Sequence, residues 1–233
     1  MAIHYFIWKG TDSRNMHIRV PNAFPVIWPE ERVEQVIIPG RSGNLTETEG
    51  EDIYESYIQT AEIAIDGAEN IRAAEQWLRG SGQVTFDCQS GLEQTARVYG
   101  SIQMGKHSRN RDKWRGNIQF YCQPVKRDRT ESGVNVTSSG TTVNNPGDMT
   151  AYPLIKITGS GQITVSSGGN TLTIPECETG WVIDSENEWI LDGTTPQEKA
   201  CSGKFPILKT GNNTILFTGN VTKLEITPRF RYL

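Results

Sequence analysis

Residues 33–66 read VEQVIIPGRSGNLTETEGEDIYESYIQTAEIAID, and their order of strands and turns decides the fold of the chain. A strand-like apolar run, Val36–Ile38, breaks at the turn dipeptide Pro39-Gly40. After an acidic loop, Glu47–Asp52, the sequence alternates again as a strand over Ile53–Thr60. A simple hairpin needs only about two to five loop residues. We therefore predict that this long, acidic connection is an arm that extends from a folded body.

The composition bounds the class of protein. The chain has 233 residues, with 23 glycines, 11 prolines and a net charge of −4. This length suits one large β unit or two ordinary domains, and the turn-forming residues favour short strands over helices. The net negative charge argues against a general affinity for nucleic acid or anionic membranes. No apolar run reaches the roughly 20 residues that span a bilayer, and no secretion signal is recognisable, so we expect folding in a cytosol.

We predict an N-terminal, β-barrel-like domain over residues 1–128, with one α-helix over Ala68–Arg79. Asp66 is the expected N-cap of this helix, and Gly80 is the expected left-handed C-cap. The apolar face of the helix comprises Ile71, Ala74, Trp77 and Leu78. The other strands expected in this domain are Ile3–Trp8, Met16–Val20, Gln83–Asp87, Ala96–Met104 and Arg115–Gln123, the last of which should stop at Pro124.

The composition changes after residue 129. Thr130–Met149 is rich in Ser, Thr, Gly and Asn and is interpreted as a linker. Short strands separated by turns then follow, a pattern typical of an antiparallel sandwich. The expected strands are Pro153–Thr158, Gln162–Ser166, Thr171–Ile174, Gly180–Asp184, Glu188–Leu191, Thr214–Thr218 and Val221–Thr227. We predict a second, all-β domain over residues 129–233, and leave open whether its last residues return to the first domain.

The four cysteines, Cys88, Cys122, Cys177 and Cys201, are widely spaced and contain no C-x-x-C pair. In a reducing compartment they are expected to be small, buried apolar residues with free thiols. Disulfides between Cys88 and Cys122, and between Cys177 and Cys201, are the alternative if the mature protein works outside a cell.

The sequence shows no set of residues typical of a catalytic or cofactor site. The histidines, His4, His17 and His107, lack metal-binding spacing, and we interpret the first two as strand residues and the third as a loop residue. No phosphate-binding loop or nucleophile motif occurs. We therefore predict no metal, no cofactor and no enzymatic activity.

A cluster of acids beside two tryptophans offers another function. Asp184, Glu186 and Glu188 lie close to Trp181 and Trp189 in the sequence. Aromatic platforms beside carboxylates suit a carbohydrate, and a glycoside hydrolase needs two carboxylates across its substrate. The simpler interpretation is a solvated turn with two half-buried tryptophans. Carbohydrate binding through the second domain is thus the alternative to a structural role.

Charge is unevenly distributed. Residues 30–69 carry eleven acids against two arginines, whereas residues 97–129 carry nine basic residues against two acids. These segments could be unrelated solvated faces. The sharper hypothesis is that the acidic edge of one subunit meets the basic edge of the next, which closes a ring. The residues expected at this contact are Glu47, Glu49, Glu51, Asp52, Arg109, Arg111, Lys113 and Arg115.

A series of short motifs follows in a consistent order. In the first half these are Val36–Leu45 (VIIPGRSGNL) followed by Tyr54 and Tyr57, then Trp77-Leu78, then Phe120–Pro124 (FYCQP). In the second half they are Val143–Gly147, Ala151–Ile155, Ile183–Glu186, Gly203–Pro206, Leu208–Asn213 and Ile226–Arg229. Together they resemble the distal tail proteins of bacteriophages and prophages with long, non-contractile tails, from Gram-positive hosts. One departure is Val125, where the family has an aromatic residue.

The resemblance implies a structural protein of the virion tail tip, or baseplate, without catalysis. It implies an N-terminal domain that forms a ring, hexameric in the family, whose β-arm embraces the neighbouring subunit, and a C-terminal galectin-like β-sandwich. The implied partners are the major tail tube protein, the tail-associated hub protein and receptor-binding proteins. DNA would pass through the ring transiently, without sequence readout.

Overall fold

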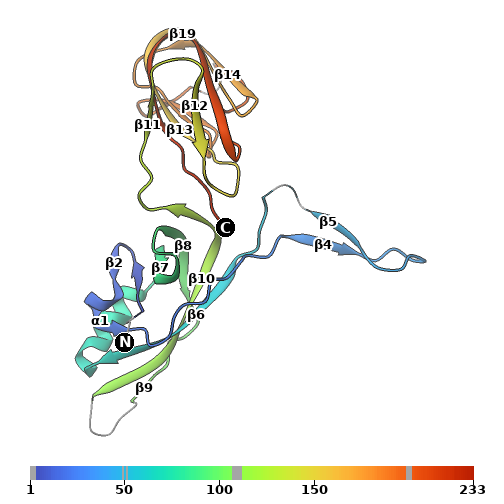
Figure 1. The fold of residues 1–233 in the computed structure, drawn as a ribbon. Coiled ribbons are helices and arrows are strands. Elements are labelled where there is room, and N and C mark those ends of the chain that lie inside the picture. The colour runs from blue at the N-terminus through green and yellow to red at the C-terminus, as the bar shows by residue number, and fades with distance from the viewer. Residues whose placement is uncertain (1–3, 49, 51, 107–111, 198–200) are drawn as a thin grey trace. The chain divides into compact units, whose positions relative to one another are not determined.

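The computed structural model describes residues 4–48, 50, 52–106, 112–197 and 201–233. The chain divides into two compact units, one of residues 1–129 together with Leu233 and one of residues 130–232 (Figure 1). β-Strands build most of both units, and the described ranges contain a single α-helix. The prediction of a mainly β fold with one helix and a projecting arm is confirmed.

The body of the first unit is an open, half-barrel antiparallel sheet of eight strands. These are β1 (Phe6–Trp8), β2 (Thr11–Asp12), β3 (Ile18–Arg19), β6 (Tyr57–Asp66), β7 (Ser81–Phe86), β8 (Leu92–Tyr99), β9 (Met104–Lys106) and β10 (Lys113–Asp128). Their order is β2-β1-β7-β8-β10-β6-β3, and β9 adds to β10. Two 3-10 turns, η1 (Ser13–Met16) and η2 (Asp87–Gln89), connect strands. The predicted strand Met16–Val20 is therefore shorter, and His17 adopts a left-handed turn (φ 57°) rather than a strand.

Aromatic side chains fill the core of this unit. Phe6, Trp8 and Phe120 are fully buried, with the rings of Phe6 and Phe120 centred 5.2 Å apart. The helix α1 (Ala68–Leu78) packs on the core, where the Trp77 ring stacks on Phe6 at 5.7 Å. The Trp8 indole N–H donates to the Trp77 carbonyl at 3.1 Å, which ties the end of the helix to the sheet. The predicted apolar face thus contacts the core.

The N-cap of α1 differs from the prediction. Gly67, not Asp66, is the N-cap residue, and its φ of 88° suits glycine. The side chain that caps the helix comes from the distant Asp112, whose Oδ2 accepts from the Ala68 amide at 2.6 Å. Gly80, with φ 83°, follows the helix end in the predicted left-handed region.

Pro124 does not end its strand. β10 continues to Asp128, and its register against β8 shifts between Cys122 and Lys126. A bulge of this kind removes residues from the hydrogen-bond ladder, so a proline that cannot donate is tolerated there. The prediction that Pro124 ends the strand is therefore wrong, because the proline lies at a bulge within β10.

A nine-stranded antiparallel sheet forms the second unit. Its strands are β11 (Val134–Val136), β12 (Thr141–Asn145), β13 (Leu154–Ser167), β14 (Asn170–Cys177), β15 (Val182–Asp184), β16 (Trp189–Asp192), β17 (Thr195–Pro196), β18 (Ser202–Gly203) and β19 (Gly211–Thr227). The path β11-β19-β13-β15-β16-β17 is extended by β12 on β19 and by β14 on β13, with β18 on β14. The predicted strands 153–158 and 162–166 are thus one strand, as are 214–218 and 221–227.

The two long strands bend where they meet. Their register shifts at Gly159 and again between Ser160 and Thr164. Gly219, with φ 95°, lies so close to the Gln162 carbonyl that a Cβ atom would be only 2.2 Å from that oxygen. The predicted breaks between residues 158 and 162 and between residues 218 and 221 are therefore bends within long strands, since a bend within a strand and a turn between strands have the same local composition.

The segment after residue 129 is not a linker. It contributes β11 and β12, and Val136, Val143 and Met149 are all buried. Val136 and Val143 belong to the core of the second unit. The polar composition wrongly indicated a linker, because alternate residues of these short strands face solvent and are polar.

All four cysteines are free thiols, and Cys122 and Cys177 are buried. Burial raises the pKa of Cys122 to about 12 and that of Cys177 to about 11, so both stay protonated at neutral pH.

Candidate assembly site

An arm built of two strands, β4 (Val33–Val36) and β5 (Leu45–Thr48), forms a sheet of its own (Figure 1). Val33 pairs with Thr48 and Val36 with Leu45, so the ribbon turns between residues 37 and 44. Gly40 and Gly43 supply positive φ angles of 81° and 80° in this turn. The tip of the arm is therefore the Pro39-Gly40 turn. Of the acidic loop that we expected to protrude, Glu47 lies in β5 and Asp52 lies at the other end of the arm, toward the body.

The root of the arm is held by a short ladder. Glu31 and Tyr54 form an isolated β-bridge, and the Arg32 amide donates to the Ile53 carbonyl at 3.0 Å. The Arg32 guanidinium donates to the Glu55 carboxylate at 2.7 Å, an exposed ion pair. These contacts hold the two chain segments together where the arm leaves the sheet.

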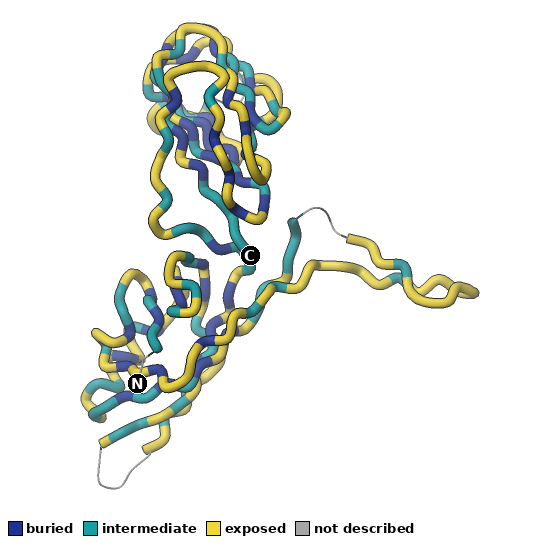
Figure 2. Tube along the Cα trace, in the orientation of Figure 1, coloured by how far each residue is buried: buried dark blue, intermediate teal, exposed yellow. Residues whose placement is uncertain are grey.

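The described residues of the arm are mostly exposed (Figure 2), and several of them carry apolar side chains. Ile37, next to the tip, is 78% exposed, and Trp28, in the segment that leads into the arm, is 86% exposed. An isolated two-stranded ribbon is at best marginally stable in water. Exposed apolar residues on such a ribbon are typical of a surface that binds a partner. Neither Ile37 nor Trp28 was singled out in the sequence as a contact residue, and Ile37 was noted only as part of a strand-like apolar run.

The arm also places two like charges opposite each other. Glu34 pairs directly with Glu47, and both are exposed. Neither makes an ion pair with a residue in the described ranges. Like charges directly opposed across two strands destabilise the pair. A positively charged partner would remove this repulsion.

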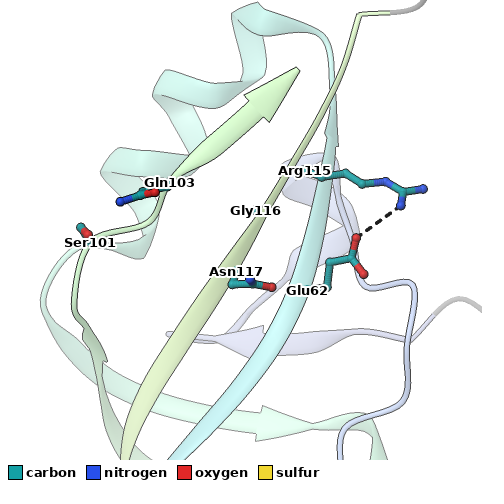
Figure 3. A pocket seen from close by; sticks show the side chains of 6 residues that line it. All are labelled: Glu62, Ser101, Gln103, Arg115, Gly116 and Asn117. Atoms are coloured by element: carbon teal, nitrogen blue, oxygen red, sulfur yellow. Dashed lines mark hydrogen bonds and ion pairs between the residues drawn. The ribbon is translucent and has the colours of Figure 1, made fainter. Parts of the chain in front are cut away.

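On the sheet, acidic and basic segments meet within one chain. β6 pairs with β10, so Arg115 lies 3.4 Å from the Glu62 carboxylate (Figure 3). Lys113 lies 3.8 Å from Asp66. Arg19 makes a second, shorter ion pair with Asp66, at 2.5 Å. Part of the complementarity between the two segments is therefore satisfied inside the subunit. The sequence could not show this, because it does not reveal which strands are neighbours.

An open, polar groove of about 630 Å³ lies beside these ion pairs. Glu62 reaches it from β6, whereas Ser101 and Gln103 lie on the other side of β10, across Gly116 (Figure 3). A Cβ atom on Gly116 would meet the Gln103 carbonyl oxygen at 2.3 Å, so glycine permits the close approach of the two segments. The described residues that line the groove supply side-chain amides, a hydroxyl and an ion pair, so its surface is mainly polar.

Of the eight residues expected at an intersubunit contact, Glu49, Glu51, Arg109 and Arg111 lie outside the described residues. The structure places Glu47 on the arm strand β5 and Asp52 near the root. Lys113 and Arg115 lie on β10, in the ion pairs given above.

The two tryptophans of the second unit differ in environment. Trp181 is 5% exposed and belongs to the core, whereas Trp189 is 54% exposed. The nearby Asp184 accepts hydrogen bonds from Arg229 at 2.7 Å and from Asn187 at 3.0 Å. Glu186 also contacts Arg229, at 3.2 Å. Two of the three acids considered for a sugar site therefore bind one arginine.

Metal-binding groups are dispersed in the part of the chain that the structure describes, where no cluster of three or more potential ligands occurs. His4 Nδ1 lies 2.6 Å from Asp87 Oδ2, and His107 falls outside the described residues. Among the described helical residues, nothing is long and apolar enough to cross a bilayer.

Comparison with known proteins supplies the fold. No protein-family model and no curated protein matches the chain. The crystal structure of the Dit protein (gp 19.1) of phage SPP1 matches it with a TM-score of 0.75 and 16% sequence identity, covering 100% of both chains. That protein is described as a paradigm of the hub adsorption apparatus in phages that infect Gram-positive bacteria. Over its whole length, therefore, the chain has the fold of the SPP1 Dit protein.

Proposed function

We propose that the protein is a distal tail protein, a structural component of the tail-tip hub of a phage or prophage, and that it works as a ring of identical subunits without catalysis. The full-length match to the SPP1 Dit fold supports this role. At 16% identity the match supplies the fold, so the function rests on the fold together with the arm.

The arm is the observation that carries the proposal. It is a two-stranded sheet with exposed apolar side chains and a pair of opposed carboxylates. Such a ribbon has little stability of its own in water, and packing on the surface of a neighbouring subunit would stabilise it. A contact between different surfaces of identical subunits closes into a ring when the rotation permits. We infer a hexamer by analogy with the distal tail proteins that the sequence resembles.

The partners follow from the same proposal. The ring would join the major tail tube protein to the tail-associated hub protein, with receptor-binding proteins docked at its periphery. DNA would pass through the central opening without sequence readout, which agrees with the net charge of −4. The site of action is the virion tail tip.

Light scattering after size-exclusion chromatography, combined with negative-stain imaging, tests the ring. We expect the full chain to form closed particles with a central hole. A variant with residues 33–52 replaced by Asn-Gly closes the root as a tight hairpin between Arg32 and Ile53, and it should be monomeric. Lys204→Glu, on the second unit, is the matched control and should leave the particle unchanged. A wild-type monomer at the highest attainable concentration would contradict the proposed ring.

A second candidate function is carbohydrate binding by the second unit, favoured by the exposed ring of Trp189. Trp181 is buried in the core, so it could contribute only after rearrangement. Glycan-array binding that is lost in Trp189→Ala, without a change in particle size, would establish this activity. An array without signal would leave the structural role as the function.

A further inference from the structure

The first unit carries an aromatic patch on the side of its sheet away from the core. Tyr121 of β10 pairs with Ile58 of β6 on one side and with Arg97 of β8 on the other. The neighbours of Tyr121 along the strand, Phe120 and Cys122, are fully buried. Because side chains alternate along a strand, Tyr121, Ile58 and Arg97 all face outward.

The patch is exposed and continuous. Ile58 is 42% exposed, Tyr121 41% and Tyr99 53%. The rings of Tyr99 and Tyr121 are centred 6.1 Å apart. Tyrosine is enriched at protein interfaces, since its ring supplies apolar area and its hydroxyl a polar contact. We call Ile58, Arg97, Tyr99 and Tyr121 the tyrosine patch.

Arg97 adds an available positive charge to this surface. Its side chain is exposed, and it forms no ion pair with any residue in the described ranges. Three other cations on this face, Arg19, Lys113 and Arg115, already contact Asp66 or Glu62. Among the described residues, Arg97 is therefore a cation on this face that an incoming carboxylate would meet without displacing an internal partner.

One face of the arm has the complementary pattern. Glu34 and Glu47 oppose each other, and Val36 and Leu45 form the next pair on that same face. Two residues along a strand correspond to about 7 Å. The carboxylates and the apolar pair on the arm are thus spaced as Arg97 and Tyr99 are on β8. An arm laid along β8 would therefore bring its carboxylates to Arg97 and its apolar side chains to the tyrosine rings.

We propose that the tyrosine patch is the docking surface for the arm of a second copy of this chain, with Glu34 and Glu47 on Arg97. The inference rests on the proposed ring and names the surface that receives the arm. The arm is the segment that fits this patch by charge and polarity. The patch has one cation beside aromatic rings, and the arm has two carboxylates beside apolar side chains. Because arm and patch are different surfaces, the contact is head-to-tail and is compatible with a closed ring.

Charge exchange tests the contact in the full-length protein. Arg97→Glu, and separately the pair Glu34→Arg with Glu47→Arg, should each weaken association by about tenfold or more, because like charges would then face each other. Combining all three substitutions in one chain should restore the wild-type particle. Mixing the two defective proteins should restore it as well, since each then supplies the surface complementary to the other. Particle mass by light scattering and sedimentation is the readout, with circular dichroism to show that each variant is folded.

The outcomes separate this inference from the proposed function. A ring that persists in Arg97→Glu, or a triple variant as defective as the single ones, would overturn the docking surface while the ring stands. A wild-type chain that stays monomeric would overturn both. Tyr121→Ala with Tyr99→Ala should also weaken association, whereas Lys204→Glu should not.

Discussion

Arg229 Nη1 lies 2.7 Å from Asp184 Oδ1, and Arg229 Nη2 lies 3.2 Å from Asp184 Oδ2. The two Nη atoms of Arg229 thus bind the two carboxylate oxygens in a bidentate pair, the geometry in which Arg–carboxylate pairs are strongest. Burial by itself would raise the pKa of Asp184, but hydrogen bonds from Arg229 and Asn187 lower it to about 2. The carboxylate is therefore charged at neutral pH and fixed in place, which suits a structural ion pair better than a general acid.

Arg229→Met should destabilise the second unit by about 1–2 kcal/mol at neutral pH, a value reduced because water reaches part of the pair. A lowered pKa in the folded state means that the stabilisation is present above the unfolded pKa of about 3.9 and is lost as the pH falls through about 2. The difference from wild type in urea unfolding should therefore shrink between about pH 4 and pH 2. Lys204→Met is the control. A difference independent of pH would show that the lost ion pair is not its source.

The cap of the helix allows a direct comparison of two aspartates. Asp112 Oδ2 accepts from the Ala68 amide, and its Oδ1 accepts from the Trp114 indole at 2.8 Å. The hydrogen bond from the Ala68 amide lowers the pKa of Asp112 most, and the hydrogen bond from the Trp114 indole lowers it further. We expect Asp112→Ala to lower the melting temperature of the first unit more than Asp66→Ala, because the latter removes only exposed ion pairs. Equal shifts in a thermal melt would refute the cap from Asp112.

The sequence predicted those features that depend on near neighbours. The apolar face of α1 and the turn at Pro39-Gly40 could be recognised because each depends on residues within one or two turns of chain. The Asp112 cap and the Lys113–Asp66 pair could not, since they join segments that are brought together only by β6 and β10. The exposure of Ile37 was also missed, because an apolar strand residue normally faces a core.

Two tryptophans should respond in opposite ways to truncation. Trp77 stacks on Phe6 and packs against the core, so Trp77→Ala should cost about 3 kcal/mol, at the lower end for such truncations because the ring is only partly buried. Trp28 is 86% exposed, so Trp28→Ala should change stability by less than about 0.5 kcal/mol. If Trp28 belongs to the assembly surface, its loss should weaken association instead. Chemical unfolding and light scattering on both variants measure the two effects, and a large stability loss in Trp28→Ala would contradict the exposed placement.

The bend of β19 is the most severe backbone constraint in the second unit. Gly219 has φ 95°, and a Cβ atom there would lie 2.2 Å from the Gln162 carbonyl oxygen. Gly211, at the start of the same strand, has a similar φ of 82° but nothing within 4 Å of the added atom. Gly211→Ala should therefore cost about 1 kcal/mol, from the left-handed backbone alone.

Gly219→Ala should cost at least about 2 kcal/mol more than Gly211→Ala, because the clash forces β13 and β19 apart where they bend together. Urea unfolding of the two variants measures the difference, and circular dichroism shows whether the sheet is retained. If the two substitutions cost the same, the close approach of Gly219 to Gln162 is not a constraint on the sheet, and the two long strands would be joined more loosely than their register indicates.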